Sequence, residues 1–523
     1  MADGPHAAGL TGKCVEALQP LDLAVTGALP PWLDGIRLLR NGPGTFDLQL
    51  DSGEAFTVPH WFDGLTQLHE FSVEGGGVRY RSRHLYPALE AHIRKHGVYG
   101  TFSGCPGRKK GVLGALALQV RRALGLAPAL APKDPTARMN IGVTIGSICE
   151  KLYSKSDVNA LAEIDPATLA PLPQTSYAAF DKRFKGFLSA AHGQRDEAAG
   201  TYYNYTMDLT ATGHAIYHVF GIPDAGRGTP HLLASVRAEP AYVHSFAQTR
   251  RYIVLIVWPL LLGLPSLALH GAPGAALDWR PERGTRFYVI DKEPGGAGHV
   301  ATFKSEPFFC FHTINAWEDE AAGALHIDLA GHDDGMGWFE QFSLPRLRSA
   351  ATPPPRVDIR RYTLPALAAA VAAGPRSEQP ASRTTLASSD TPGGVWTYEL
   401  PRINKAHAMQ PYRFVYTAAA TSAGAPFFDA IAKTDVGTGS TQLWRTRGHF
   451  PGEPVFVARP GGTAEDDGLL LSVVLAGPEQ HSYLLLLDAA SLQEVARAML
   501  PHTIGFGFHG NVFQRDGATT DLA

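Results

Sequence analysis

The chain has 523 residues, and its 46 Lys plus Arg against 49 Asp plus Glu give a formal net charge of −3. This balance creates no strong positive field, so it argues against nucleic acid as a partner. A hydrophobic content of 45% is enough for a large core, and 55 glycines and 39 prolines favour many tight turns.

Short β-like runs bounded by Gly, Pro, Asn and Asp recur along the whole chain. Examples are Val78–His84, Thr201–Asp208, Thr285–Asp291, Val395–Leu400, Leu469–Val474 and Ser482–Leu487. Helical patterns are fewer: Pro87–Lys95, Val112–Leu126, Leu364–Ala373 and Leu492–Met499. Many turn-separated strands predict a sandwich, a barrel or a propeller, and the length favours a propeller of several four-stranded blades, although no sharp repeat recurs. We expect an all-β fold in which residues 1–523 form a single domain.

The first residues, M-A-D-G-P-H-A-A-G-L, lack the basic and apolar regions of a secretory signal. The cysteines show neither metal-binding nor disulfide spacing; they are Cys14, Cys105, Cys149 and Cys310. Both observations predict a reducing intracellular compartment, the cytoplasm.

Two apolar stretches bear on membranes. Val112–Leu126 places four apolar side chains on one helical face, namely Leu113, Leu116, Val120 and Leu124. Basic residues lie before this segment and beside its apolar face. This pattern suits either an interfacial helix that dips one face into lipid or an ordinary surface helix packed on the body. Tyr252–Leu269 begins like a strand and is interrupted by proline and glycine, so it would make a poor transmembrane helix.

Four histidines stand near the ends of β-like runs: His192, His244, His312 and His509. A histidine on an apolar strand, such as His312 in F-F-C-F-H, most often hydrogen-bonds to a buried carbonyl. The four are 52, 68 and 197 residues apart, and a propeller blade spans roughly 40–60 residues, so each could come from a different blade. Four neutral imidazoles would suit iron, zinc or copper. Because the chain has 21 histidines, spacing alone does not select these four.

Six separate motifs, in order and spread over nearly the whole chain, are similar to those of the carotenoid cleavage dioxygenases (carotenoid oxygenases). R-N-G-P-G at 40–44 and H-W-F-D-G at 60–64 resemble the two N-terminal signatures of that family. A-H-G-Q-R-D, Y-V-H-S-F, F-H-T-I-N-A-W-E and F-H-G resemble its four iron-histidine motifs.

The resemblance implies a seven-bladed β-propeller with a cap of helices and loops over the metal-bearing face. One Fe(II) per chain would be held by His192, His244, His312 and His509. In the family, three acids hydrogen-bond to three of the histidines, and the matching motifs supply Glu399, Glu453 and Asp157. Many relatives carry Glu where this chain has Asp157, and the shorter side chain would need a water or a small backbone shift. No catalytic side chain is expected beyond these ligands and acids.

Other motif residues have no expected part in the chemistry. His60, Asp63 and Gly64 of H-W-F-D-G are interpreted as structural, with Gly64 serving a turn. Aromatic residues near the ligands are candidates either for the wall of a substrate tunnel or for plain core packing: Phe311, Trp317, Phe506 and Phe508. Gly505 and Gly507, which precede His509, would leave space for a bulky object next to the backbone.

The activity implied by the resemblance is cleavage of a C=C double bond of a carotenoid or apocarotenoid by O2, giving two carbonyl products. The hydrophobic polyene would lie in an apolar tunnel, and Val112–Leu126 would contact a membrane surface at its mouth, making the protein peripherally membrane-associated. A stilbene-cleaving dioxygenase is one alternative, but such relatives carry a Lys where this chain has Ser156. A retinyl-ester isomerohydrolase and a non-catalytic pigment-binding propeller are the others. The sequence carries no signal for an oligomeric state.

Overall fold

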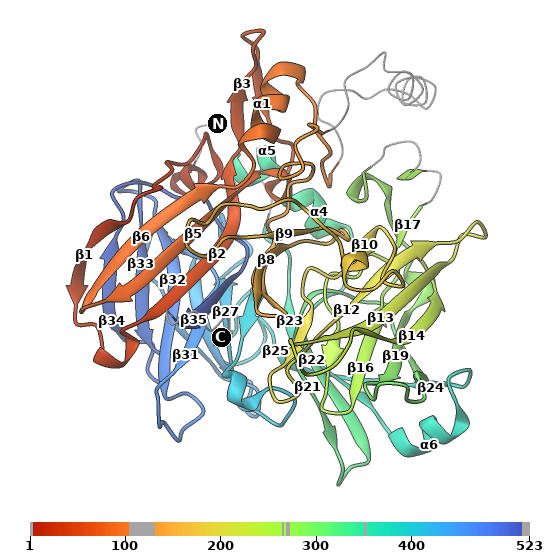
Figure 1. Ribbon diagram of the computed structural model, residues 1–523. Coiled ribbons are helices and arrows are strands. Elements are labelled where there is room, and N and C mark those ends of the chain that lie inside the picture. The colour runs from red at the N-terminus through yellow and green to blue at the C-terminus, as the bar shows by residue number, and fades with distance from the viewer. Residues whose placement is uncertain (1–3, 104–130, 264–265, 268–271, 350–352, 515–523) are drawn as a thin grey trace.

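β-Strands between Leu21 and Gln514, nearly all of them paired antiparallel, form sheets around a common centre, and the expected all-β propeller is confirmed (Figure 1). The structure, a computed structural model, describes residues 4–103, 131–263, 266–267, 272–349 and 353–514.

The largest sheet joins both ends of the chain. β2 (Ile36–Thr45) pairs with β5 (Leu65–Glu74) along one edge and with β35 (Gly510–Gln514) along the other. β1 (Leu21–Gly27) lies between β6 (Gly77–His84) and β34 (Glu494–Met499). The same ten-stranded sheet contains β30 (His449–Pro451), β31 (Val455–Ala458), β32 (Gly468–Ala476) and β33 (His481–Asp488). Figure 1 accordingly shows the first strands in red beside the last strands in blue.

The expected count of seven blades is wrong. Among the described residues, five separate sheets have four or more strands. The physical reason lies in β1, which is hydrogen-bonded along both edges and so merges strands from the two ends of the chain into one sheet. A further sheet has only three strands, β7 (Thr144–Ile148), β8 (Lys151–Lys155) and β9 (Leu161–Glu163).

Four more sheets complete the ring. The first contains β10 (Leu188–Ser189), β11 (Gln194–Asp196), β12 (Thr201–Leu209), β13 (Ala215–Pro223) and β14 (His231–Ala238). The second contains β15 (Ala247–Gln248), β16 (Tyr252–Val257), β19 (Thr285–Asp291), β20 (His299–Ser305) and β24 (Glu378–Pro380). The third contains β21 (Phe309–Asp319), β22 (Ala324–His332), β23 (Asp358–Leu364) and β25 (Ser382–Ala387). The fourth contains β26 (Thr397–Arg402), β27 (Phe414–Ala420), β28 (Ala430–Asp435) and β29 (Thr441–Trp444).

Two small hairpins stand apart from these sheets. They are β3 (Asp47–Gln49) with β4 (Ala55–Thr57), and β17 (Leu260–Leu262) with β18 (Leu277–Trp279).

Strand β33 shows why several strands read as unbroken apolar runs rather than as alternating ones. Leu484 and Leu486 pack in one hydrophobic core, and Leu485 and Leu487 pack in another. Successive side chains of a strand point to opposite faces, so both faces of this strand are covered. A strand buried on both faces has no solvent side on which polar residues would be placed.

One expected helix is wrong. Residues 494–499 of the expected helix Leu492–Met499 form strand β34, in which Ala496 and Ala498 are buried and their neighbours Val495, Arg497 and Met499 are partly exposed. This period of two, together with pairing to β33 and β1, stabilises a strand over the local helical preference.

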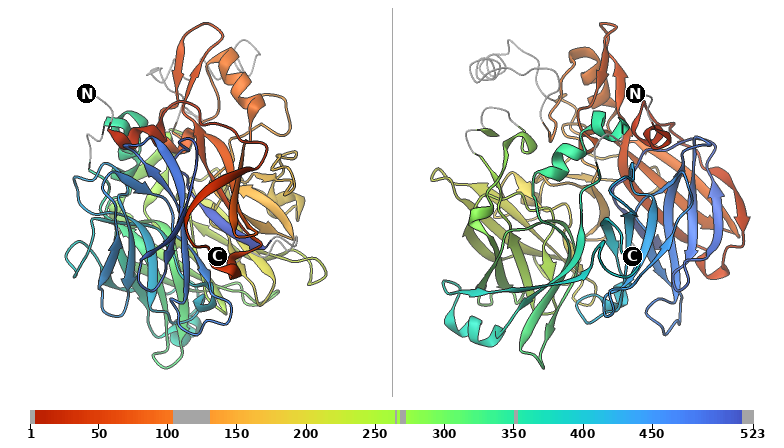
Figure 2. Two further views of the ribbon diagram at one scale, coloured as in Figure 1. Left: turned by 90° about the vertical axis from the view of Figure 1, so that its left-hand side faces the viewer. Right: turned by 180° about the vertical axis from the view of Figure 1, so that it is seen from behind.

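Most of the remaining helices lie at one end of the propeller. α1 (Pro87–His96), α4 (Gly337–Gln341) and α5 (Leu344–Ser349) share that end in all views, whereas α6 (Leu367–Ala373) lies at the opposite one (Figures 1 and 2). The expected interfacial helix Val112–Leu126 falls outside the described residues. Among the helices that the structure describes, none is long and apolar enough to cross a membrane.

Candidate metal centre

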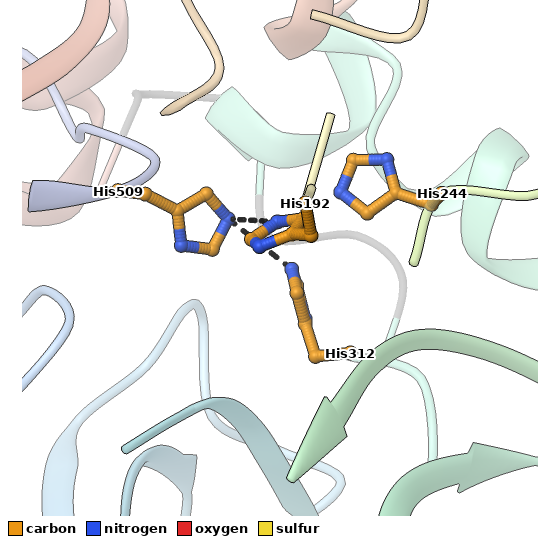
Figure 3. Close-up of side chains that lie close together, drawn as sticks. All are labelled: His192, His244, His312 and His509. Carbon is orange, nitrogen blue, oxygen red and sulfur yellow. Dashed lines mark hydrogen bonds between the residues drawn. The ribbon is translucent and has the colours of Figure 1, made fainter. Parts of the chain in front are cut away.

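Four histidines from four different parts of the propeller converge on one point (Figure 3). His192 lies between β10 and β11, His244 precedes β15, His312 belongs to β21, and His509 immediately precedes β35. One ring nitrogen of each lies within 4.8 Å of the others. The structure therefore brings together all four of the expected ligands; their binding of iron remains a prediction.

Backbone irregularities aim these side chains. The pairing of β21 with β22 shifts register between Cys310 and Thr313, which breaks the alternation of the strand at His312. The Ser245 hydroxyl donates to the Phe311 carbonyl at 2.6 Å and accepts from the Thr313 amide at 3.2 Å. Ser245, which follows His244, thus fixes the backbone on both sides of His312.

The glycines before His509 make room for the chain's own N-terminal motif. A Cβ on Gly507 would lie 2.3 Å from the Arg40 guanidinium carbon, and a Cβ on Gly505 would lie 2.2 Å from the Pro43 carbonyl oxygen. The expected bulky object next to this backbone is therefore the R-N-G-P-G segment itself. The His509 amide and carbonyl are held by Val143 and Asn41.

Three carboxylates bind the outer nitrogens of three of the histidines. His312 Nδ1 lies 2.5 Å from Glu399 Oε2, and His509 Nδ1 lies 2.8 Å from Glu453 Oε1. His244 Nδ1 lies 2.8 Å from Asp157 Oδ1. Because a carboxylate accepts, each Nδ1 carries the proton and donates, which leaves the Nε2 lone pair of that ring directed at the centre.

The inner nitrogens fit a shared cation. His312 Nε2 and His509 Nε2 lie 3.2 Å apart, and His192 Nε2 lies 3.0 Å from His509 Nε2. His312 and His509 both donate from Nδ1, so their facing Nε2 atoms are two lone pairs that repel each other without a cation between them. Two nitrogens held about 2.1 Å from one ion at a right angle would be about 3.0 Å apart. The donor set of this centre therefore fits a transition-metal ion.

Burial and charge set the protonation that such an ion requires. Burial lowers the pKa of the His509 imidazole to about 4, against the opposing effect of Glu453. Burial and the neighbouring rings lower the pKa of His192 as well. Burial acts to raise the pKa of the Glu453 and Glu399 carboxyls, but their partners outweigh it. Arg402 and His509 lower the pKa of Glu453 to about 2. His312 and His332 hold the pKa of Glu399 well below its usual range. At neutral pH His192 and His509 are therefore neutral and the two acids charged.

Asp157 reaches its histidine directly, so of the two expected adjustments, a water or a small backbone shift, the water is not needed. Its second oxygen, Oδ2, accepts from the Tyr242 hydroxyl at 2.9 Å. Sequence reasoning missed Tyr242, although its place two residues before His244 in Y-V-H was an available signal.

Two further partners of the acids were also missed. Arg402 Nε donates to Glu453 Oε1 at 2.8 Å, and His332 Nε2 lies 3.0 Å from Glu399 Oε1. Arg402 follows Glu399 by three residues in E-L-P-R, which could have drawn attention to it. His332 stands in A-G-H-D-D, where nothing in the sequence indicates a link to Glu399.

An aromatic cavity of about 350 Å³ opens beside the histidines. His244, His312 and His509 contribute to its wall, and so do Ser156 and Asp157. Its aromatic lining consists of Trp61, Phe62, Tyr99, Phe102, Tyr242, Phe311, Phe342, Phe428 and Phe508. Helical and loop segments that include 61–64, 99–102 and Phe342 thus cover the histidines from this side.

The expected tunnel-lining residues divide into two pairs. Phe311 and Phe508 line this cavity, which is the first of the two alternatives left open for them. Phe506 instead stacks on Phe427, with ring centroids 4.1 Å apart, and Trp317 packs in a separate core against Tyr412.

A second cavity of about 430 Å³ adjoins the histidine cluster and shares two of its members, His312 and His509, with the first. His192, His312 and His509 line it together with charged side chains that are absent from the wall of the aromatic cavity: Lys155, Arg195, Glu197, Arg402, Lys405 and Glu453. The centre therefore lies between an aromatic space and a more polar one.

The H-W-F-D-G segment has a structural part, as predicted. His60 accepts from the Phe62 amide through Nδ1, and Asp63 accepts from the Phe102 amide at 2.7 Å. Gly64 serves a turn, as predicted, because its amide donates to the Trp61 carbonyl at 3.3 Å, but its φ of −59° is one that any residue adopts. It is needed for close packing, since a Cβ there would lie 2.4 Å from Pro43 Cβ.

Comparison with known proteins places these features among oxygenases. The family model described as retinal pigment epithelial membrane protein matches residues 13–514. The carotenoid dioxygenase of Neurospora crassa is 29% identical, over 97% of this chain and 91% of that protein. The beta,beta-carotene 15,15'-dioxygenase of Rattus norvegicus is 30% identical, over 95% and 89%.

Solved structures support the fold. A variant of the Synechocystis apocarotenoid oxygenase aligns with a TM-score of 0.76 at 23% identity, over 98% of both chains. A cobalt-substituted form of that oxygenase aligns with a TM-score of 0.76 at 22% identity, again over 98% of both chains.

Proposed function

The chain belongs to the carotenoid oxygenase family that the retinal pigment epithelial membrane protein model describes, and on that premise we propose that it cleaves a C=C double bond of a carotenoid or apocarotenoid with O2 to give two carbonyl products. The observation that carries the proposal is the group of four histidines, three of them braced by carboxylates, in the wall of an aromatic cavity. The relatives named as carotenoid and beta,beta-carotene dioxygenases support the substrate class.

We propose that the centre holds one Fe(II) per chain through His192, His244, His312 and His509. Bound there, Fe(II) would supply the redox-active centre needed to activate dioxygen, which redox-inert zinc does not supply. Neutral imidazole ligands with fixed tautomers suit this ion.

The side chains around the centre orient the histidines and position the substrate. Glu399, Glu453 and Asp157 each hold one histidine in the tautomer that leaves Nε2 free for the metal. The aromatic wall, with Phe311 and Phe508 next to the histidines, would position a polyene by shape, because such a substrate offers few polar groups to bind.

A panel of substrates tests the proposal. We expect iron-loaded protein to convert a carotenoid or an apocarotenoid into two carbonyl fragments, identified by their masses, and to leave a hydroxystilbene intact. Ser156 in the cavity wall supports this choice, since it offers no cation for a phenol. Consumption of the hydroxystilbene alone, hydrolysis of a retinyl ester alone, or binding of pigment without any product would contradict it.

We also propose that the protein is intracellular and attaches to a membrane surface through Val112–Leu126. The amphipathic pattern of that segment supports this, and so does Met139, which lines the aromatic cavity and is 41% exposed. Replacing the apolar face of Val112–Leu126 by serine should reduce co-sedimentation with liposomes. The substituted residues are Leu113, Leu116, Val120 and Leu124. Leu172→Ser, at another exposed apolar residue, is the control, and unchanged sedimentation of the fourfold variant would refute the proposal.

A further inference from the structure

Glu399 binds two histidines, of which only one belongs to the metal centre. Its Oε2 accepts from His312 Nδ1 at 2.5 Å, and its Oε1 accepts from His332 Nε2 at 3.0 Å. His332 is 2% exposed, and it is not among the four converging rings. The carboxylate is therefore held at both oxygens by imidazole groups.

The position of His332 leaves it little freedom. It is the last residue of β22 and pairs in register with Phe309 of β21, three residues before His312. Its ring packs against Phe309 and Phe311, with centroids 5.7 and 5.9 Å away. The surrounding aromatic rings offer no competing acceptor, so the Nε2–H is directed at the carboxylate.

Local backbone geometry also aims Glu399. The residue after it, Leu400, has a φ of +52°, in the left-handed region that non-glycine residues rarely adopt. In that conformation the Leu400 amide turns back and donates to Glu399 Oε2 at 3.1 Å. The pairing of β26 with β27 shifts register between Glu399 and Arg402 at the same place. An unusual conformation of this kind persists only where the surroundings hold it.

We propose that His332 is a positioning residue, which clamps the second oxygen of Glu399 and thereby fixes the direction in which His312 presents Nε2 to the metal. The terminal torsion of a glutamate is broad, so a carboxylate held at one oxygen can rotate. Holding Oε1 removes that rotation and keeps Oε2 on His312 Nδ1. This role rests on the metal centre of the proposed function.

Cobalt binding measures the role without requiring catalysis. Metal-free protein is titrated with Co(II) against a chelating indicator, and the absorption bands of the bound ion report on its surroundings. We expect His332→Leu to weaken binding about 3- to 10-fold, less than the about 10- to 100-fold expected for a partner that contacts a ligand directly, such as Glu399. We expect His332→Gln to restore nearly normal binding, because its side-chain amide can donate from about the position of Nε2.

A double substitution separates positioning from packing. In protein that carries Glu399→Ala, adding His332→Leu should change cobalt affinity less than about twofold, since the group through which His332 acts is gone. Multiplication of the two single effects would overturn the proposal. His326→Leu, on the same strand but bonded to Thr363, is the matched control and should leave cobalt affinity unchanged.

The outcomes distinguish this role from the proposed function. Failure of the unsubstituted protein to bind cobalt would refute the metal centre and the positioning role together. Normal cobalt binding by both the unsubstituted protein and His332→Leu would refute the positioning role alone. Thermal unfolding of each variant shows that the protein measured is folded.

Discussion

His312→Ala should abolish product formation while leaving folded protein. His312 Nε2 lies 3.2 Å from His509 Nε2, and its Nδ1 is bound to Glu399, so the substitution removes a metal ligand and the proton donor of an acid together. Loss of an outer partner of a ligand already weakens metal binding or activity by about 10- to 100-fold, so loss of the ligand itself should lower activity by at least about 100-fold.

Product formation from a carotenoid at fixed added iron, together with cobalt titration, measures the effect. His218→Ala is the control, because His218 lies on strand β13 and bonds to Ser235, away from the centre. Retention of more than a tenth of the activity by folded His312→Ala would contradict the assignment of His312 as a ligand.

Glu453→Leu should lower both stability and metal affinity. Glu453 accepts from His509 Nδ1 at 2.8 Å, from Arg402 Nε at 2.8 Å and from the Gly510 amide at 2.7 Å. A leucine leaves these donors without an acceptor and leaves a largely buried guanidinium without its counter-charge. Breaking such a pair from one side typically lowers the free energy of unfolding by about 3–5 kcal/mol. The freed ring of His509 should weaken cobalt binding by about 10- to 100-fold.

The control for Glu453→Leu is another buried acid of the same kind. Glu70 bonds to Arg37 and Arg81 and touches none of the four histidines. Glu70→Leu should lower the urea midpoint similarly but leave cobalt affinity unchanged. Equal cobalt affinity in Glu453→Leu and Glu70→Leu would show that Glu453 acts through stability alone.

The histidines and acids of the centre could be predicted because each sits in a short, recognisable stretch of sequence at a strand end. His192, His244, His312 and His509 all reach one point, as expected from one ligand per blade. The acids followed from motif positions, including Asp157, whose direct contact with His244 joins residues 87 apart.

The features that could not be predicted depend on long-range pairing. β1 links two parts of the largest sheet, because it pairs with β6 near residue 80 and with β34 near residue 497. The local sequence therefore does not determine where one blade ends. Leu492–Met499 carries a weak helical pattern that pairing with β33 and β1 overrides. His332 lies 67 residues from Glu399, and only the fold brings the two together.

Metal analysis of the purified, unsubstituted protein is the decisive test for a single iron held by four histidines. We expect about one iron per chain, because four imidazoles directed at one point form a single binding site. Zinc in place of iron, or a protein that takes up no iron, would contradict it.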